Sequence, residues 1–268
     1  MKKHLSVLIA SLLLSVVVNA EQNKKPSVFV TVPPQAGIVK QIAGNLVTVQ
    51  PLINGANCPE TYSPSPKQLE ALSKTDLFLD LGMPFEEIWL KKAGVLGIIK
   101  TEHMSFGIKL RKNDPHIWTS INNVVTMAKN TTQALKNLMP EHSECFDKNL
   151  KEFEKKAEIL DAKIKVILKD SKGKKLFVFH PYYGYFADSY GLEQIPIEDE
   201  GKSPTAKQLA KIIAEIKKQN NKIILTQPEF DTKIASSVAK EAGAKLVTAS
   251  IYSEDILKNI EEIATKWK

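Results

Sequence analysis

Two histidines lie in sequence contexts that could place an imidazole in a ligand site. His116 follows Asp-Pro in the run 114–118, and His180 directly follows the apolar run 176–179. The carboxyl end of a parallel strand is where α/β folds place ligand groups. Imidazole is a common neutral ligand for Zn²⁺ and other transition metals. Each histidine alone is more often structural, but the pair suggests one metal site shared by two parts of the chain.

The remaining sequence shows which elements must position these histidines. Short β-rich runs alternate with helical runs from residue 27 onward, which predicts parallel sheets. The expected strands cover residues 27–32, 47–53, 77–81, 175–180, 223–226 and 245–248. The expected helices cover residues 35–43, a short segment opened by a capping box at 65–68, and residues 120–139, 205–218, 234–242 and 255–267. The polar surroundings of His103 and His142 predict surface positions.

One apolar stripe runs from Phe146 to Ile167 in alternating steps of four and three residues. This period predicts a single helix from residue 141 to about residue 169, roughly 45 Å long at 1.5 Å per residue. A helix of that length suits a rod between two lobes, or a partner helix in a coiled coil. Residues 63–69 and 203–209 agree at five of seven positions, which favours two lobes of similar topology.

The sequence therefore predicts an α/β fold in which one long backbone helix joins two lobes with parallel sheets. We expect lobes over residues 21–140 and 171–268, a connecting helix over residues 141–170, and a ligand cleft between the lobes.

The first twenty residues match a secretory signal peptide. A basic start is followed by an apolar run over residues 5–18, and Val18 and Ala20 are small residues before the expected cleavage site. The apolar run is short for a membrane span, so a retained anchor is the weaker alternative. Cleavage after Ala20 leaves 248 residues and lowers the net charge from +7 to +5. No cysteine lies near the cut, so we expect a protein without a lipid anchor in a bacterial periplasm.

Composition excludes several classes. An apolar share of 43% and a charged share of 25% exclude a wholly disordered, collagen-like or multi-span membrane protein. Two cysteines exclude a disulfide scaffold and a four-cysteine zinc module. Only Arg111 among the 37 basic residues is arginine, and the lysines are scattered. Because arginine provides most bidentate recognition of bases and phosphates, we expect no nucleic-acid partner.

Several spaced motifs together resemble a known family. They are the runs 55–66, 114–118, 179–187 with 190–192, and 226–230. From about residue 27 to its end, the chain is similar to the periplasmic metal-binding proteins of zinc and manganese ABC importers, the ZnuA/TroA-like group. This resemblance implies capture of a divalent metal, Zn²⁺ first and Mn²⁺ next, and its delivery to an inner-membrane ABC permease. It also implies a monomer without enzymatic activity and two α/β lobes joined by a long helix.

The resemblance assigns His116 and His180 as metal ligands. We also expect the nearby Asp114 to orient His116, as carboxylates commonly do for metal-binding histidines. Glu60 occupies the position where the family usually has histidine. A carboxylate can still bind Zn²⁺, and it favours harder ions such as Mn²⁺. The alternative is that Glu60 is a solvated loop residue. Many zinc-binding members also have a histidine-rich loop that this chain lacks.

The fourth ligand is less defined, because the family's late aspartate falls at Ser250. The candidates are Glu229, which we favour, and Glu198, Glu200, Ser250 or water. Cys58 lies two residues from Glu60. In an oxidising periplasm its thiol could pair with Cys145, and as a thiolate it could bind the metal.

Two other functional classes compete with metal transport. A His-His-Glu site with an open position could activate water as zinc hydrolases do. The chain contains neither a His-Glu-x-x-His motif nor a Gly-x-Ser-x-Gly motif, which argues against an enzyme. A cell-envelope adhesin is the other alternative, since related receptors lie near cell envelopes.

Overall fold

The structure is a computed structural model that describes residues 25–53, 59, 62–112, 114–198, 204–220, 222–228 and 232–268. The predicted signal peptide lies outside these residues, as do Cys58, Glu60, Glu200 and Glu229. In the part of the chain that the structure describes, no helix combines the length and apolar character needed to cross a membrane.

The first sheet is parallel throughout and has the strand order β2-β1-β3-β4. Its strands are β1 (Ser27–Val30), β2 (Thr48–Pro51), β3 (Leu77–Asp80) and β4 (Thr101–His103). Three helices belong to this part, α2 (Pro33–Ala43), α3 (Pro66–Leu72) and α4 (Pro84–Lys92). The central strands β1 and β3 are almost entirely buried, as expected of strands covered on both faces. We call this sheet, its helices and the segment from β4 to residue 119 the N-lobe.

The second sheet repeats this arrangement with the order β6-β5-β7-β8, again parallel throughout. Its strands are β5 (Lys175–Val178), β6 (Glu193–Pro196), β7 (Ile223–Thr226) and β8 (Lys245–Thr248). The helices of this C-lobe are α7 (Gly184–Tyr190), α8 (Ala206–Lys217) and α9 (Lys233–Ala242). The shared strand order confirms the predicted α/β fold with two similar parallel sheets.

The short sequence repeat encodes equivalent helix starts in the two lobes. Ser65 caps α3 and Thr205 caps α8, and each hydroxyl accepts a hydrogen bond from the backbone N–H of the glutamine three residues later. Both glutamine side chains complete the reciprocal capping box. The repeat therefore reflects the same local structure in each lobe.

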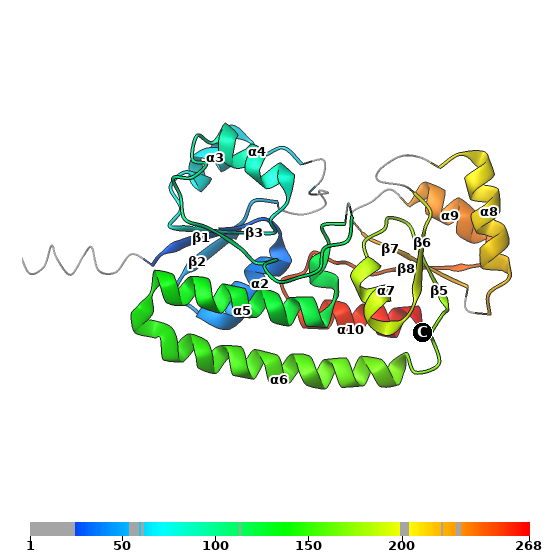
Figure 1. The fold of residues 1–268 in the computed structure, drawn as a ribbon. Helices are drawn as coiled ribbons and strands as arrows, with labels where there is room; N and C mark the ends of the chain where they lie inside the picture. Colours follow the sequence, from blue (N-terminus) through cyan, green and yellow to red (C-terminus); the bar gives the residue numbers. More distant parts are fainter. Residues whose placement is uncertain are drawn as a thin grey trace, which may run out of the picture.

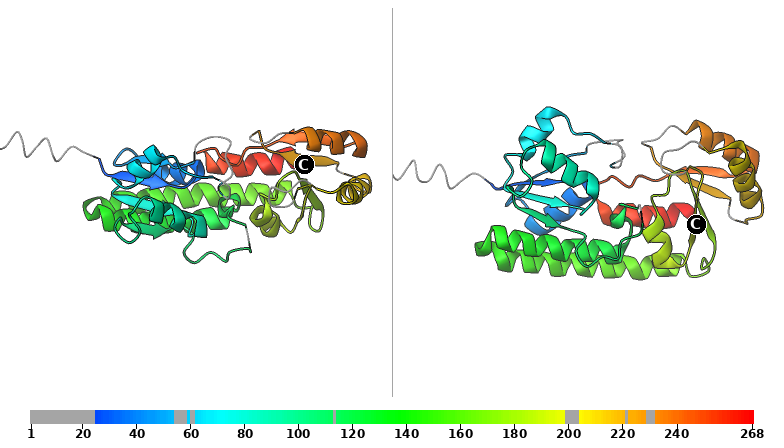
Figure 2. Two further views of the ribbon diagram at one scale, coloured as in Figure 1. Left: turned by 90° about the horizontal axis from the view of Figure 1, so that it is seen from above. Right: turned by 45° about the horizontal axis from the view of Figure 1, so that its top comes forward.

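Two long helices lie beneath the lobes, the first under the N-lobe and the second continuing under the C-lobe as well (Figures 1 and 2). The 3₁₀ turn η1 (Ile117–Thr119) leads into α5 (Ile121–Leu138). A second 3₁₀ turn, η2 (Pro140–His142), then leads into α6 (Ser143–Ile167). With 25 residues α6 is about 37 Å long. The closing helix α10 (Ile256–Trp267) lies between the lobes above α6 (Figure 1).

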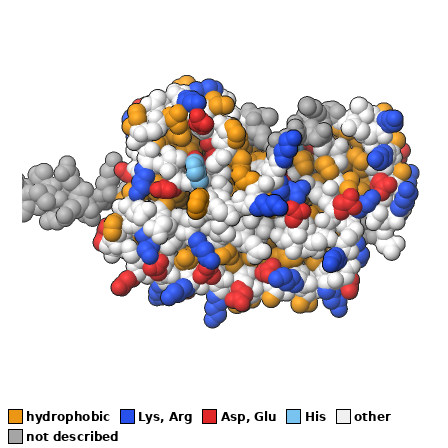
Figure 3. Space-filling model, in the orientation of Figure 1, with side chains coloured by type: hydrophobic (Ala, Val, Ile, Leu, Met, Phe, Trp, Pro, Cys, Tyr) orange, Lys and Arg blue, Asp and Glu red, His pale blue; other side chains and the backbone are white. Residues whose placement is uncertain are grey.

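The predicted stripe of α6 is confirmed, and helices of the same chain cover it. Phe146, Phe153, Ala157, Leu160 and Ile164 are buried, and α6 packs on α2, α5 and α10. One apolar cluster extends from β1 and β3 through these helices to β5. A smaller cluster lies between the C-lobe sheet and the helices α8 and α9. Acidic and basic side chains are interspersed over the outer helices (Figure 3).

Several element predictions need correction. The sequence reading omitted α4, β4, α7 and β6. Both β4 and β6 are edge strands with polar residues, so they lack the apolar runs that identify central strands. Helix α2 begins at Pro33 rather than at residue 35, because proline is tolerated in the first helical turn. The domain boundaries at residues 140 and 170 stay predictions.

Candidate metal centre

His116 lies in a tight turn just before η1, and Asp114 fixes its orientation. Oδ1 of Asp114 accepts hydrogen bonds from the backbone N–H of His116 at 3.0 Å and from its ring Nδ1 at 2.9 Å. The His116 carbonyl accepts the Thr119 hydroxyl at 2.9 Å. A carboxylate on Nδ1 places the ring lone pair on Nε2, the arrangement found behind many zinc ligands. The predicted contact between Asp114 and His116 is therefore confirmed.

His180 lies at the carboxyl end of β5, and Glu198 lies at the same end of the neighbouring strand β6. Val178 pairs in register with Pro196, so His180 and Glu198 face each other two residues further on. The ring Nδ1 of His180 makes a short hydrogen bond with Oε1 of Glu198. Glu198, a candidate fourth ligand from the sequence, thus holds the same position relative to His180 that Asp114 holds relative to His116.

The structure brings the two histidines together from the two lobes. Their ring centroids lie 6.0 Å apart with an interplanar angle of 87°. Both are buried, with relative exposures of 1% for His116 and 2% for His180. Tyr182 packs against both, with centroid distances of 4.2 Å to His116 and 4.1 Å to His180. Two imidazoles held by carboxylates in a largely water-excluded site are suited to bind one transition-metal ion.

Aromatic side chains from distant segments enclose this pair. The ring of Trp118 lies 5.3 Å from that of His116, and Tyr252 lies 6.0 Å from Trp118 and 6.2 Å from Tyr182. These aromatic roles were not assigned from the sequence. The tyrosines that follow His180 were the one sequence feature that could have indicated an aromatic enclosure. The contact of Trp118 with Tyr252 could not be predicted, because it forms only in the folded chain.

The C-terminal segment that carries Ser250 is attached to both lobes. The Tyr183 hydroxyl donates to the carbonyl of Ala249 at 3.0 Å, and the indole Nε1 of Trp118 donates to the carbonyl of Ile251 at 2.9 Å. The hydroxyl of Ser250 accepts a hydrogen bond from the backbone N–H of Tyr252 at 3.2 Å. Ser250 therefore lies in a segment fixed beside the aromatic enclosure.

Glu60 and Glu229 lie outside the described residues, but the structure shows where their segments begin. The described chain continues past β2 to Ile53, whose backbone N–H donates to the carbonyl of Thr31 at 3.0 Å. Apart from residue 59, it is described again from Tyr62, whose hydroxyl bonds to Gln68 at 2.9 Å. Residue 229 follows β7, the neighbour of the His180 strand. Both segments thus start at the carboxyl ends of strands, and both ligand assignments stay predictions.

The other candidate residues lie apart from the histidine pair. Cys145 is exposed on α6, and since Cys58 is not described, their disulfide stays a prediction. His142 is half-buried rather than exposed. His103 is exposed as predicted, and its Nδ1 lies 2.6 Å from Oδ1 of the buried Asp80.

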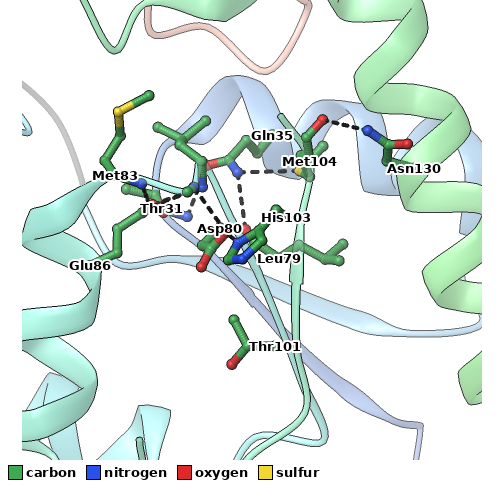
Figure 4. Close-up of polar contacts among 12 residues, drawn as sticks. Thr31, Gln35, Leu79, Asp80, Met83, Glu86, Thr101, His103, Met104 and Asn130 are labelled. Carbon is green, nitrogen blue, oxygen red and sulfur yellow. Dashed lines mark hydrogen bonds and ion pairs between the residues drawn. The ribbon is translucent and has the colours of Figure 1, made fainter. Parts of the chain in front are cut away.

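His103 and Asp80 belong to a second polar cluster at the carboxyl ends of β3 and β4 (Figure 4). A second buried member is Glu86, which accepts the Thr31 hydroxyl and the backbone N–H groups of Leu81 and Met83. Burial and the charge of Asp80 raise the pKa of Glu86 to about 8. Since its carboxyl oxygens accept backbone N–H groups just before α4, this cluster stabilises the N-lobe locally.

The fold and the site define a class of protein: a two-lobed solute-binding protein with a candidate metal site between its lobes. Residues 28–265 match the family model described as "Zinc-uptake complex component A periplasmic". The chain belongs to this ZnuA family.

Similar proteins agree with this assignment. The high-affinity zinc uptake system protein ZnuA of Bacillus subtilis (strain 168) is 29% identical over 245 residues, which cover 82% of this chain and 76% of that protein. A crystal structure of ZnuA has a TM-score of 0.85 and 34% identity, covering 91% of this chain and 98% of the other. A ZnuA deletion mutant with zinc bound has a TM-score of 0.84 and 33% identity, covering 91% and 96%.

Proposed function

We propose that this protein captures a divalent transition metal, Zn²⁺ in preference to Mn²⁺, and delivers it to an ABC permease of the inner membrane. The observation that carries the proposal is the buried contact between His116 and His180, one from each lobe. Each imidazole is already oriented by a carboxylate, which favours a metal-binding nitrogen at Nε2. Membership of a zinc-uptake family supports the choice of ion.

The proposed coordination shell combines the two imidazoles with Glu60 and Glu229. Two nitrogens and two carboxylates suit tetrahedral Zn²⁺, and the carboxylates also accept Mn²⁺. In this proposal Asp114 and Glu198 act through the histidines rather than on the ion. The shell thus contains groups from both lobes, so binding of the ion favours the arrangement in which the lobes are close.

Calorimetric titration with Zn²⁺ and with Mn²⁺ tests the proposal. We expect wild-type protein to bind one Zn²⁺ more tightly than Mn²⁺, and the variant with both His116→Ala and His180→Ala to lose at least 100-fold in affinity. His142→Ala is the matched control, because it removes a half-buried imidazole next to α6. Glu60→Gln and Glu229→Gln test the remaining ligands. Unchanged affinity in the double histidine variant would overturn the proposal.

Export and delivery form the second part of the proposal. We propose that the chain is cleaved after Ala20 and works outside the cytoplasm. Mass spectrometry of protein recovered from periplasm would then show a chain that begins at Glu21. Loaded wild-type protein should stimulate ATP hydrolysis by its permease in vesicles, and the double histidine variant should not stimulate it in a metal-dependent way.

A further inference from the structure

Arg111, the sole arginine of the 268-residue chain, contacts both lobes. It lies in the loop between β4 and η1, three residues before Asp114. Its Nε lies 3.3 Å from Oδ2 of Asp114, and its Nη1 makes a short contact with Oδ2 of Asp188 on α7. One guanidinium therefore joins the turn that carries His116 to the helix that follows His180.

Tyr185 of α7 makes a second link to the same turn. Its hydroxyl accepts a hydrogen bond from the backbone N–H of Arg111 at 2.8 Å and donates one to the carbonyl of Asp114 at 3.0 Å. The guanidinium carbon of Arg111 lies 6.0 Å from the centre of the Tyr185 ring. The backbone of the His116 turn is thus fixed to the C-lobe independently of the charged contact.

Gly184, the first residue of α7, allows this close approach. A Cβ at Gly184 would lie 2.5 Å from Oδ2 of Asp114 and 2.7 Å from Nε of Arg111. These separations are shorter than any ordinary carbon contact, so a larger residue must displace the Arg111–Asp114 pair. The absence of a side chain at position 184 thus leaves room for the Arg111–Asp114 pair against α7.

We propose that Arg111 is a positioning residue, an interlobe clamp that keeps the metal site closed and slows release of the ion. This inference rests on the proposed function. Oδ2 of Asp114 faces Arg111, while Oδ1 of the same carboxylate orients His116. Separation of α7 from the loop therefore also disturbs the group that holds the metal-binding imidazole.

The two arms of the clamp differ in exposure. The side chain of Asp114 is 11% exposed and that of Asp188 is 62% exposed. Salt screens the outer contact with Asp188 strongly and the inner contact with Asp114 much less. A lysine at position 111 offers one compact charge instead of a planar fork, so it can satisfy only one of the two carboxylates well.

The test measures the rate at which Zn²⁺ leaves the loaded protein. Stopped-flow mixing with excess chelator gives this rate, and the fluorescence of Trp118 beside the site reports the release. We expect Arg111→Ala to raise the release rate about tenfold, the lower end of what loss of an outer-shell partner costs. Arg111→Lys should be intermediate, and the association rate should change little.

The release rates of Asp188→Asn and Lys136→Ala distinguish an effect of the clamp from an effect of losing any ion pair. Asp188→Asn removes only the exposed arm, so we expect a rise of about threefold at low salt that disappears at 1 M salt. Lys136→Ala removes a half-buried pair between α5 and α6, away from the histidines, and should release Zn²⁺ at the wild-type rate.

Gly184→Ala removes no charge but should also speed release, because the new methyl group displaces the Arg111–Asp114 pair. Wild-type release rates in Arg111→Ala, Arg111→Lys and Gly184→Ala would overturn the clamp. If His116→Ala still abolished Zn²⁺ binding in that case, the proposed function would stand. Wild-type affinity in the double histidine variant would instead reject the proposed function and the clamp together.

Discussion

The imidazole of His116 lies edge-on to the ring of Tyr182, with 4.2 Å between ring centroids and an interplanar angle of 79°. Tyr182 is completely buried and also contacts His180. One aromatic ring thus supports both candidate ligands, and replacing it changes the packing on both sides of the site.

Tyr182→Ala should lower both stability and metal affinity, because it leaves a cavity beside two imidazoles. We expect a loss of about 3 kcal/mol in the free energy of unfolding, measured in urea on the metal-free protein. Tyr182→Phe preserves the ring and should remain within a few-fold of wild-type Zn²⁺ affinity. If the alanine variant bound Zn²⁺ as tightly as the phenylalanine variant, Tyr182 would not support the site.

Asp114→Asn and Glu198→Gln should each weaken Zn²⁺ binding about 10- to 100-fold while the fold is retained. The amides cannot supply the negative charge that stabilises a metal-bound imidazole. Competition with a chelator of known affinity gives the measurement. Asp147→Asn, which removes a carboxylate paired with Lys136 of α5 and away from the histidines, is the control. Equal losses in all three variants would show a general charge effect instead.

Glu86 predicts a particular dependence of stability on pH. Its pKa of about 8 in the folded protein lies above its ordinary value, mainly because of burial and then because of Asp80. Between about pH 4.5 and pH 8 the folded state retains a proton that the unfolded state loses. The contribution of Glu86 to stability is therefore present at acid pH and decreases as pH rises, by about 1 kcal/mol per pH unit.

Urea unfolding at several pH values measures this contribution as the difference between wild type and Glu86→Gln. Glutamine cannot ionise, so the variant should show a flatter decline between pH 5 and pH 8. It should be less stable than wild type at pH 5, since its amide nitrogen cannot accept the backbone N–H groups that bind the carboxyl. Parallel pH profiles for the two proteins would contradict the prediction.

Gly37→Ala should destabilise the protein strongly. A Cβ at Gly37 on α2 would lie 1.8 Å from the carbonyl oxygen of Glu254, which is backbone and cannot rotate away. We expect a loss of about 3 kcal/mol, at the upper end of overpacking effects. Gln41→Ala on the exposed face of the same helix is the control for thermal unfolding. Comparable melting temperatures for the two variants would show that the C-terminal segment shifts at low cost.

Much of the fold could be predicted, because central strands and long amphipathic helices have clear periodic patterns. The stripe from Phe146 to Ile167 identified α6, and β7 and β8 have the predicted bounds. The omitted strands β4 and β6 are edge strands that contain polar residues. Their places in the sheets depend on pairing partners far away in the sequence. No local pattern reveals such pairing.

The candidate site could be predicted only in part. His116 and His180 were identified by the elements that precede them, and the structure places them together. The contact of Glu198 with His180 arises from the register of β5 and β6. It could not be predicted, because β6 itself was not recognised in the sequence. The contacts of Arg111 connect residues more than seventy positions apart and required the assembled lobes.

The apolar core that passes from β1 and β3 through α6 to β5 limits how far the two lobes can move relative to each other. This one cluster joins the N-lobe sheet, the connecting helices and β5, so denaturant should unfold both lobes in one cooperative transition. We expect a receptor with such a shared core to change its conformation little when it binds its ion. Folding then positions the ligands before the ion arrives and so largely determines the affinity. The time that the ion remains bound depends on interlobe contacts such as those of Arg111.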